Sequence, residues 1–234
     1  VKLQGIKLDR WLGTEMGQEV QVHAFCDAAP SGGYGAVLYV RFKGQGGRGG
    51  WQVQFLVSKV RLVPMKMDSI PRAELCAAQL GTRLVQTMKK ELEAVLKIKK
   101  IVLWSDNEVV LAWVAAEAHK YQVWVCNRVA EIQLALRELE EQQAEFRYVN
   151  TKQNPADLVT RGLTFSEFEA AQEFWFHGPS WLKQEESEWP SNATLEETKE
   201  EARKEADLAL FIDTTLGDLL PVVEFSSWTR LQRM

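Results

Sequence analysis

The feature that most constrains the fold is a short alternating stretch that ends on an acid. Residues 20–27 alternate small apolar side chains with larger or polar ones, and the run closes on Asp27 just before a turn rich in alanine and glycine. Alternation with a period of two is typical of a β-strand. A carboxylate at the tip of a strand is held rigidly while it faces solvent, as the oxygen ligand of a hard cation must be. Acids at strand ends are also common where no functional site exists, so the function of Asp27 depends on which other residues lie near it.

Two more strands are expected next. Residues 34–41 and 51–58 alternate in the same way, and residues 44–50 between them are mostly glycine. A glycine-rich stretch of this kind predicts a hairpin loop. The first third of the chain is therefore expected to form a three-stranded antiparallel meander.

A long helix is expected over residues 71–96, after the helix-start signals around Pro71. It carries Glu74, followed on the same face by the small residues Ala77, Ala78 and Gly81. Small side chains at this spacing allow a helix to lie close to a sheet. Glu74 is then carried in near a strand, an unusual place for an unpaired acid.

The fourth predicted strand, like the first, ends on an acid. Residues 101–106 form a short apolar run of the buried-strand type that closes on Asp106. The intervening helix lets this strand lie parallel to the first, with the right-handed connection that nearly all such crossovers have. Parallel neighbours ending on Asp27 and Asp106 place both carboxylates at one edge of the sheet, where open α/β sheets bind ligands.

The remaining elements complete the sheet and supply a fourth acid. A helix is expected over 121–142 and a fifth strand over 146–149. The segment Asn154-Pro155-Ala156-Asp157 has the spacing of a helix start, and taken alone Asp157 is better explained as an acid favoured by the helix dipole. We therefore expect an α/β fold with a mixed five-stranded sheet flanked by helices.

Four acids on these elements can reach one edge of the sheet: Asp27, Glu74, Asp106 and Asp157. Without a compensating base they would repel one another, and such a cluster is tolerable when divalent cations occupy it. Phosphodiester cleavage with two metal ions is the reaction built in this way.

Several motifs together resemble the ribonuclease H domain of BEL/Pao-type LTR retrotransposon polyproteins. They are Phe25-Cys-Asp-Ala, Ser58-Lys-Val-Arg, Ile70-Pro-Arg-Ala-Glu-Leu-Cys-Ala, Trp104-Ser-Asp106, Asn127-Arg-Val-Ala-Glu-Ile, Val149-Asn-Thr-Lys-Gln-Asn-Pro-Ala-Asp-Leu-Val-Thr-Arg-Gly162, Trp175-Phe-His-Gly-Pro-Ser-Trp181-Leu and Trp189-Pro190. The resemblance covers roughly residues 20–190. It implies an RNase H-like fold, two Mg²⁺ ions for which Mn²⁺ can substitute, and hydrolysis of the RNA strand of an RNA–DNA hybrid.

The resemblance carries the four acids over as metal ligands. Asp27 is expected to bridge both ions. Glu74 and Asp106 are expected to hold the ion nearer the leaving 3′-oxygen, and Asp157 the ion that activates the attacking water.

Four other residues are predicted to contact the substrate. Asn107 directly follows Asp106 and could reach a ribose 2′-hydroxyl, the group that distinguishes RNA from DNA. Lys59, Arg72 and Arg128 are expected phosphate contacts. A solvated surface explains each of the three equally well, and Arg128 could instead stabilise its own helix.

The sequence departs from the family pattern at two places. The loop 150–153 lacks the His that many ribonucleases H carry before the last acid, and Asn107 stands where Ser is more common. The missing His bears on the rate of cleavage more than on activity itself. The alternative function is a catalytically silent or domesticated RNase H-like module that binds nucleic acid or organises a polyprotein. A different nuclease of the same fold is a third interpretation, although integrase-like cores and proofreading exonucleases space their acids differently.

The composition divides the chain into a mildly basic body and an acidic tail. Residues 1–160 hold 21 Lys or Arg and 17 Asp or Glu, whereas the remainder holds 7 and 15. We expect a lead-in segment (1–19), a catalytic domain (20–162), an aromatic extension packed on it (163–190) and an acidic connector toward a following domain (191–234). The three cysteines lack metal-ligand spacing, so a zinc site is not expected.

The partners follow from the same resemblance. The chain starts at Val1 and no apolar run is long enough to span a bilayer, so we expect an intracellular fragment of a longer polyprotein without a membrane segment. Residues 226–231 resemble the connector before integrase. The expected partners are an RNA–DNA hybrid and neighbouring reverse transcriptase and integrase domains, in a cytoplasmic retroelement particle or the nucleus.

Overall fold

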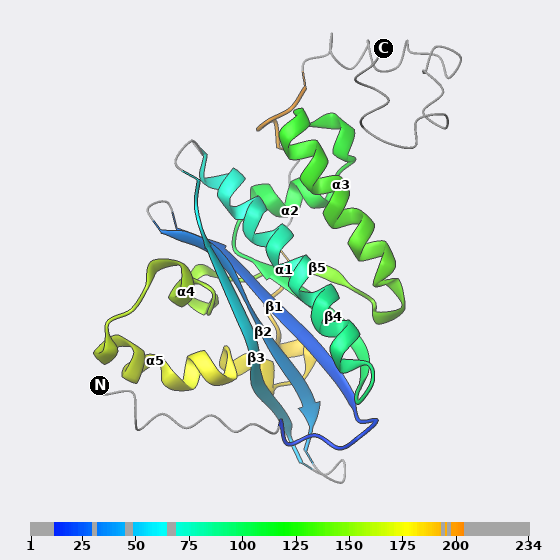
Figure 1. Cartoon of the computed structure of the whole chain (residues 1–234), viewed down its shortest axis with the longest axis vertical. Coiled ribbons are helices and arrows are strands. Elements are labelled where there is room, and N and C mark those ends of the chain that lie inside the picture. The colour runs from blue at the N-terminus through cyan, green and yellow to red at the C-terminus, as the bar shows by residue number, and fades with distance from the viewer. Residues whose placement is uncertain are drawn as a thin grey trace, which may run out of the picture.

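A five-stranded mixed sheet forms the centre of the molecule (Figure 1). The computed structural model describes residues 12–29, 32–44, 49–64, 69–192, 195 and 198–203. The strands are β1 (Glu19–Ala28), β2 (Gly33–Lys43), β3 (Trp51–Leu62), β4 (Lys97–Ser105) and β5 (Glu145–Tyr148). Their order across the sheet is β3-β2-β1-β4-β5, with β1, β2 and β3 antiparallel and β4 and β5 parallel to β1. This is the fold class that the sequence predicted.

Helices lie on both faces of this sheet (Figure 1). The α-helices are α1 (Ile70–Leu92), α2 (Glu108–Ala115), α3 (Val123–Glu138), α4 (Asp157–Arg161) and α5 (Phe165–His177). Short 3-10 turns are η3 (Ala118–Lys120), η4 (Glu140–Gln142), η5 (Thr151–Gln153), η6 (Ser180–Lys183) and η7 (Glu186–Glu188). None of the helices in the described ranges is long and apolar enough to cross a membrane.

Several boundaries differ from those expected. The first three strands are longer than predicted, and β4 begins at Lys97 because its exposed lysines already pair with the start of β1. The helix predicted over 121–142 ends at Glu138 and continues as the turn η4. Residues 45–48 of the glycine-rich loop and all of residues 226–231 lie outside the described residues.

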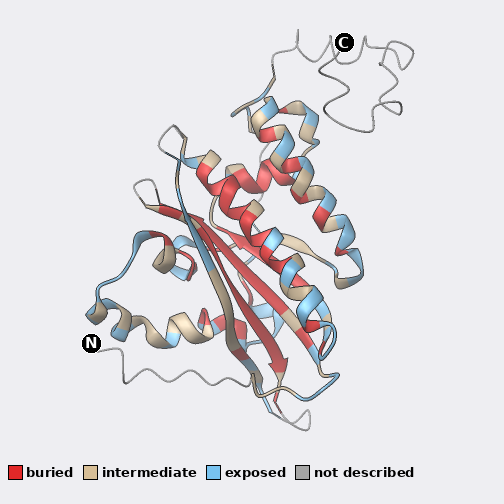
Figure 2. Cartoon of the chain, in the orientation of Figure 1, coloured by how far each residue is buried: buried red, intermediate tan, exposed pale blue. Residues whose placement is uncertain are grey.

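The register of β1 and β4 decides where the acids lie. Cys26 pairs with Ser105, so Asp27 and Asp106 follow at the same edge of the sheet. The centre of β1 is buried on both faces: Ala24 and Cys26 belong to the core under α1, and Phe25 belongs to the core of the opposite face. Figure 2 shows this burial along the central strands.

Helix α1 lies close to the sheet at its small residues. Ala77, Ala78 and Gly81 are buried, and a Cβ at Gly81 would overlap the Sγ of Cys26. The prediction that this face permits close contact is therefore confirmed at Gly81. The close contact carries Glu74, one to two turns earlier, toward the end of β1.

The aromatic extension covers the opposite face. Trp181 and Trp189 pack against Trp104 at ring-centroid distances of 4.8 and 5.8 Å. The Tyr39 hydroxyl donates a hydrogen bond to the carbonyl of Trp175 at 2.8 Å. Residues 163–190 thus contribute to the core of the domain.

One charged side chain ties this extension to the sheet. Arg41 on β2 is 1 % exposed and lies between the rings of Trp51 and Trp189. Its guanidinium donates to the carbonyls of Leu182 and Gln184 and to the side chain of Gln21. The sequence analysis did not identify this residue.

Part of the expected connector lies on the domain. Residues 198–203 form a short antiparallel bridge and several hydrogen bonds with residues 120–122. The backbone of this part of the predicted connector 191–234 is therefore bonded to the domain. The rest of the predicted domain boundaries remain predictions.

Candidate metal centre

Three carboxylates meet at the ends of β1 and β4. Asp27, Glu74 and Asp106 each offer an oxygen such that all three oxygens lie within 4.8 Å of one another. They come from three elements: the end of β1, the first turns of α1 and the residue after β4. The adjacency of β1 and β4 and the close packing of α1 bring them together.

Glu74 is the most unusual of the three. It is 7 % exposed, and its Oε2 atom is buried without a hydrogen-bond partner. Burial and, after it, the charges of Asp27 and Asp106 together raise the pKa of this carboxyl to about 9, although a hydrogen bond from the Ala28 backbone N–H acts in the opposite direction. A buried carboxylate oxygen without a hydrogen-bond partner is suited to bind a cation.

Asp27 is held by a hydroxyl group. It is 4 % exposed, and Oγ1 of Thr160 on α4 donates a hydrogen bond to its Oδ2. Burial raises the pKa of Asp27 to about 6, the hydrogen bond from Thr160 lowers it, and the nearby charge of Asp106 raises it. The bond from α4 leaves Oδ1 of Asp27 for another interaction.

A buried amide connects the two strand ends. Asn154 is 1 % exposed, and its Nδ2 donates to the carbonyl of Cys26 at 2.9 Å and to Oδ1 of Asp106 at 3.4 Å. Its Oδ1 accepts from the backbone N–H of Ala156 at 3.2 Å. The sequence analysis assigned Asn154 only the capping function, since nothing local in the sequence indicates the contacts with β1 and β4.

Thr160 was also missed. The available signal was its spacing of three residues from Asp157, which places both on one face of a helix. The backbone confirms the close fit of α4 here, because a Cβ at Gly32 would overlap the Thr160 carbonyl.

Asp157 lies at the edge of this cluster. It is the first residue of α4 and is outside the group of three oxygens defined above. Its Oδ1 forms an ion pair with Nε of Arg161 at 2.5 Å. Burial raises the pKa of Asp157, the Arg161 charge lowers it, and the Asp106 charge raises it again. Asp157 is therefore electrostatically coupled to the cluster while its side chain is paired elsewhere.

The donor set fits a hard divalent cation. All three clustered groups are carboxylates, the ligands that Mg²⁺ and Ca²⁺ prefer, and no cysteine or histidine joins them among the described residues. Burial and the neighbouring carboxylates raise the pKa values of Asp27 and Glu74, and a bound cation would favour the ionised form of both groups.

Of two predicted substrate residues, Asn107 directly follows Asp106 of the cluster, whereas Lys59 lies farther away on β3. Asn107 caps α2, its Oδ1 accepting from the Val110 backbone N–H at 3.1 Å. This bond uses only the amide oxygen, so the two N–H donors of the side chain are still suited to a hydroxyl. Lys59 lies on the edge strand β3 in register with Ala36 and is exposed. It lies two strands from β1 and is not part of the acid cluster.

The other two predicted contacts lie near the starts of α1 and α3. The Arg72 guanidinium forms a bidentate ion pair with Glu201 at 2.6 and 2.9 Å. Arg128 lies over the ring of Trp124 at 3.6 Å and donates to its carbonyl, which supports the interpretation that it stabilises its helix. It also lines a polar groove of about 370 Å³ with Asn127.

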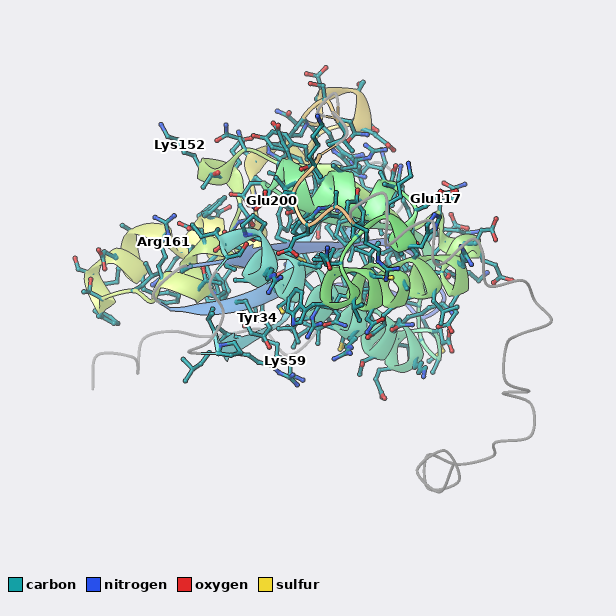
Figure 3. The ribbon with its side chains drawn as sticks, turned by 90° about the horizontal axis from the view of Figure 1, so that it is seen from above. Tyr34, Lys59, Glu117, Lys152, Arg161 and Glu200 are labelled. Carbon is teal, nitrogen blue, oxygen red and sulfur yellow. The ribbon has the colours of Figure 1, made fainter. Side chains whose placement is uncertain are left out.

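Figure 3 shows the molecule from above, with side chains drawn as sticks. Lys152 and Arg161 lie on one side of this view, Tyr34 and Lys59 on another, and Glu200 between them. The loop 150–153, which lacks a His, forms the short turn η5 here, with the Asn150 side chain capping the Lys152 backbone N–H.

The sheet order and the acid cluster at its edge define an RNase H-like domain. Residues 1–107 match the family described as "Pao retrotransposon-like RNaseH-like domain". This match covers less than half of the chain and confirms the resemblance seen in the motifs. Residues 1–107 are thus similar to the RNaseH-like domain of this family. Among curated proteins no relative matches the sequence.

Solved structures with a similar arrangement include two ribonucleases H and a viral protease-reverse transcriptase. The N-terminal RNase H domain of a Mycobacterium tuberculosis protein is 11% identical, with 67% of this chain and 98% of that chain covered and a TM-score of 0.39. LC11-RNase H1 in complex with RNA/DNA hybrid is 11% identical, with 61% and 94% covered and a TM-score of 0.41. The foamy viral protease-reverse transcriptase in complex with RNA/DNA hybrid is 7% identical, with 68% and 21% covered and a TM-score of 0.35.

Proposed function

We propose that the chain is a ribonuclease H that hydrolyses the RNA strand of RNA–DNA hybrids with two bound Mg²⁺ ions. The observation that carries this proposal is the convergence of Asp27, Glu74 and Asp106 within 4.8 Å, with an unpartnered buried oxygen on Glu74. The Pao-type family match supports the choice of reaction among those that carboxylate clusters perform. Mn²⁺ is expected to substitute for Mg²⁺.

The four acids have different supporting contacts. One oxygen of Asp27 accepts a hydrogen bond from Thr160, and the carboxylates of Glu74 and Asp106 belong to the same cluster. Glu74 and Asp106 complete the cluster of three, and Asp157 would join after exchanging its ion pair with Arg161 for a cation. When bound, the two ions would activate a water molecule and stabilise the leaving oxygen.

The protein's own residues supply rigidity and substrate orientation. Asn154 holds the ends of β1 and β4 together, and Thr160 fixes the rotamer of Asp27. The Asn107 amide is expected to donate to a ribose 2′-hydroxyl, and Lys59 and Arg128 to contact phosphates on either side. A hybrid offers 2′-hydroxyls on one strand only, so RNA–DNA duplex should be cut in preference to DNA duplex.

The wider context is part of the same proposal. The domain is expected to act within a retroelement polyprotein beside reverse transcriptase and integrase domains, in a cytoplasmic particle or the nucleus. The foamy viral neighbour is named as a protease-reverse transcriptase, which supports such an arrangement by analogy. The functional unit is expected to span residues 20–190 together with residues 198–203.

The test is cleavage of one labelled sequence as hybrid, RNA duplex and DNA duplex, each with Mg²⁺ and with EDTA. Hybrid should be cut only with Mg²⁺. Equal cutting of hybrid and DNA duplex would indicate a general nuclease. Tight hybrid binding without cleavage, in the presence of bound metal, would favour the catalytically silent module.

A further inference from the structure

Residues 198–203, here called the strap, bind across the beginnings of α1 and α3. The Gln122 backbone N–H donates to the Glu201 carbonyl at 2.7 Å, and the Arg203 N–H donates to the Lys120 carbonyl at 2.8 Å. Ala202 forms an antiparallel bridge with Tyr121. The strap is thus held by strand-like backbone pairing.

Side chains add further contacts. The indole Nε1 of Trp113 on α2 donates to the Glu200 carbonyl at 3.1 Å. The Glu201 carboxylate binds Arg72 through two hydrogen bonds, and only 16% of the Glu201 side chain is exposed. By contrast, Glu200 is an exposed residue.

The surface under the strap has the chemistry of a nucleic-acid site. The Trp124 ring lies between two guanidiniums, at 5.2 Å from that of Arg72 and 3.6 Å from that of Arg128. Trp124 is half-buried, and arginine beside an accessible aromatic ring is a combination that binds phosphates and bases in nucleic-acid grooves. Arg72 is also in the first turn of α1, two residues before Glu74.

The ion pair between Glu201 and Arg72 has the geometry of a contact between a phosphate and an arginine. A carboxylate and a phosphate both bind a guanidinium through two parallel N–H···O bonds. Glu201 adopts this geometry while its own backbone is in the left-handed region, at a φ of 57°. That conformation is unfavourable for a residue other than glycine, so the bound strap carries strain that its release would relieve.

We propose that the strap is an internal competitor of nucleic acid. Glu201 occupies on Arg72 the place of a backbone phosphate, so the bound strap and the bound duplex exclude each other on this surface. The identity of the duplex as RNA–DNA hybrid rests on the proposed function. The strap would thereby lower the affinity of the free domain for hybrid and make duplex binding depend on its release.

The experiment measures binding rather than cleavage. Full-length chains carrying Asp106→Asn, to prevent turnover, are titrated with a fluorescently labelled RNA–DNA hybrid. Glu201→Gln is compared with Glu200→Gln, which removes the same charge from the neighbouring exposed residue. We expect Glu201→Gln to tighten hybrid binding about five- to tenfold and Glu200→Gln to change it less than twofold. Adding Arg72→Gln to Glu201→Gln should abolish the gain.

Limited proteolysis within 198–203 reports whether the strap is released. The proposal is overturned if Glu201→Gln releases the strap without tighter binding, if it weakens binding, or if both Gln variants have equal effects. Cleavage by the chain with Asp106 intact is measured separately. A chain that fails to cut hybrid but shows the binding difference refutes the proposed hydrolysis and leaves the strap proposal standing.

Discussion

The sheet buries charge at two places, the acid cluster at the end of β1 and the guanidinium of Arg41 on β2. Arg41 is surrounded by acceptors: two carbonyls of the extension, the side chain of Gln21 and two tryptophan rings. Glu74 in the acid cluster has an oxygen without a partner and two like charges nearby. Each guanidinium nitrogen of Arg41 has an acceptor within the chain, whereas Oε2 of Glu74 has no hydrogen-bond partner among the described residues.

This difference teaches how to separate structural from functional burial. A buried charge whose donors are all satisfied stabilises the fold once its partners are present, and removing it leaves those partners unpaired. A buried charge with no partner destabilises the fold and persists where a ligand is needed. Substitutions in the two regions should therefore act on different properties, and four measurements test this.

The largest expected effect is on catalysis at the acid cluster. Asp27→Asn or Asp106→Asn should lower the rate of hybrid cleavage by at least about 10³-fold, because each removes a metal-ligand charge worth several kcal/mol in the transition state. The unfolding free energy should stay the same or rise, since repulsion is also removed. Initial rates and urea unfolding measure the two properties, and Glu169→Gln on the exposed side of α5 is the control. A fully active Asn variant would refute the site.

The next effect is on stability at Arg41. Arg41→Met should lower the unfolding free energy by about 3 kcal/mol, because the carbonyls of Leu182 and Gln184 lose their donor in a buried position. Arg41→Lys should lower the unfolding free energy by less, because lysine keeps the positive charge although it lacks the forked N–H donors of the guanidinium. Urea unfolding gives both values. If Arg41→Met unfolds at the same urea concentration as the unaltered chain, the extension is not anchored by this residue.

A third measurement uses pH and metal to sharpen the contrast. The pKa of Glu74 in the folded chain is about 9 and that of Asp27 about 6, both above the ordinary values of 4.5 and 3.8. The folded chain therefore binds these protons more tightly than the unfolded chain, so stability in EDTA is greatest at low pH and is lost as pH rises from about 4 toward 9.

Thermal unfolding between pH 5 and pH 9 tests this linkage. In EDTA the midpoint should fall by several degrees over this range, and Mg²⁺ should raise it most at high pH, where the carboxylates are ionised. Glu74→Gln should flatten the fall in EDTA. A midpoint that rises with pH in EDTA would contradict the assignment of uncompensated charge to this cluster.

The smallest effect is expected at the hydroxyl that holds Asp27. Thr160→Val removes the donor while keeping the shape, and should lower the unfolding free energy by about 1 kcal/mol and weaken Mg²⁺ binding a few-fold. Thr160→Ser keeps the hydroxyl and is the matched control. Calorimetric titration with Mg²⁺ measures the affinity. Equal affinities for the Val and Ser variants would show that the hydroxyl does not position Asp27.

The sequence by itself determined the elements and most of the acid cluster. The alternation of residues 20–27, the buried run ending on Asp106 and the small face beside Glu74 are local patterns, each contained in one strand or helix. Local periodicity reflects which face of an element is buried, so it can be read without knowing the neighbours. The parallel crossover then required Asp27 and Asp106 to share one edge.

Only the tertiary structure decided which polar groups meet across long distances in the chain. Asn154 reaches Cys26, Arg41 reaches Leu182, and Arg72 reaches Glu201, each over more than 120 residues. Such contacts have no periodic signature, because they depend on the angles and spacing at which finished elements pack. For the same reason the sequence left Arg72 as a phosphate contact, whereas the folded chain pairs it with its own acidic tail.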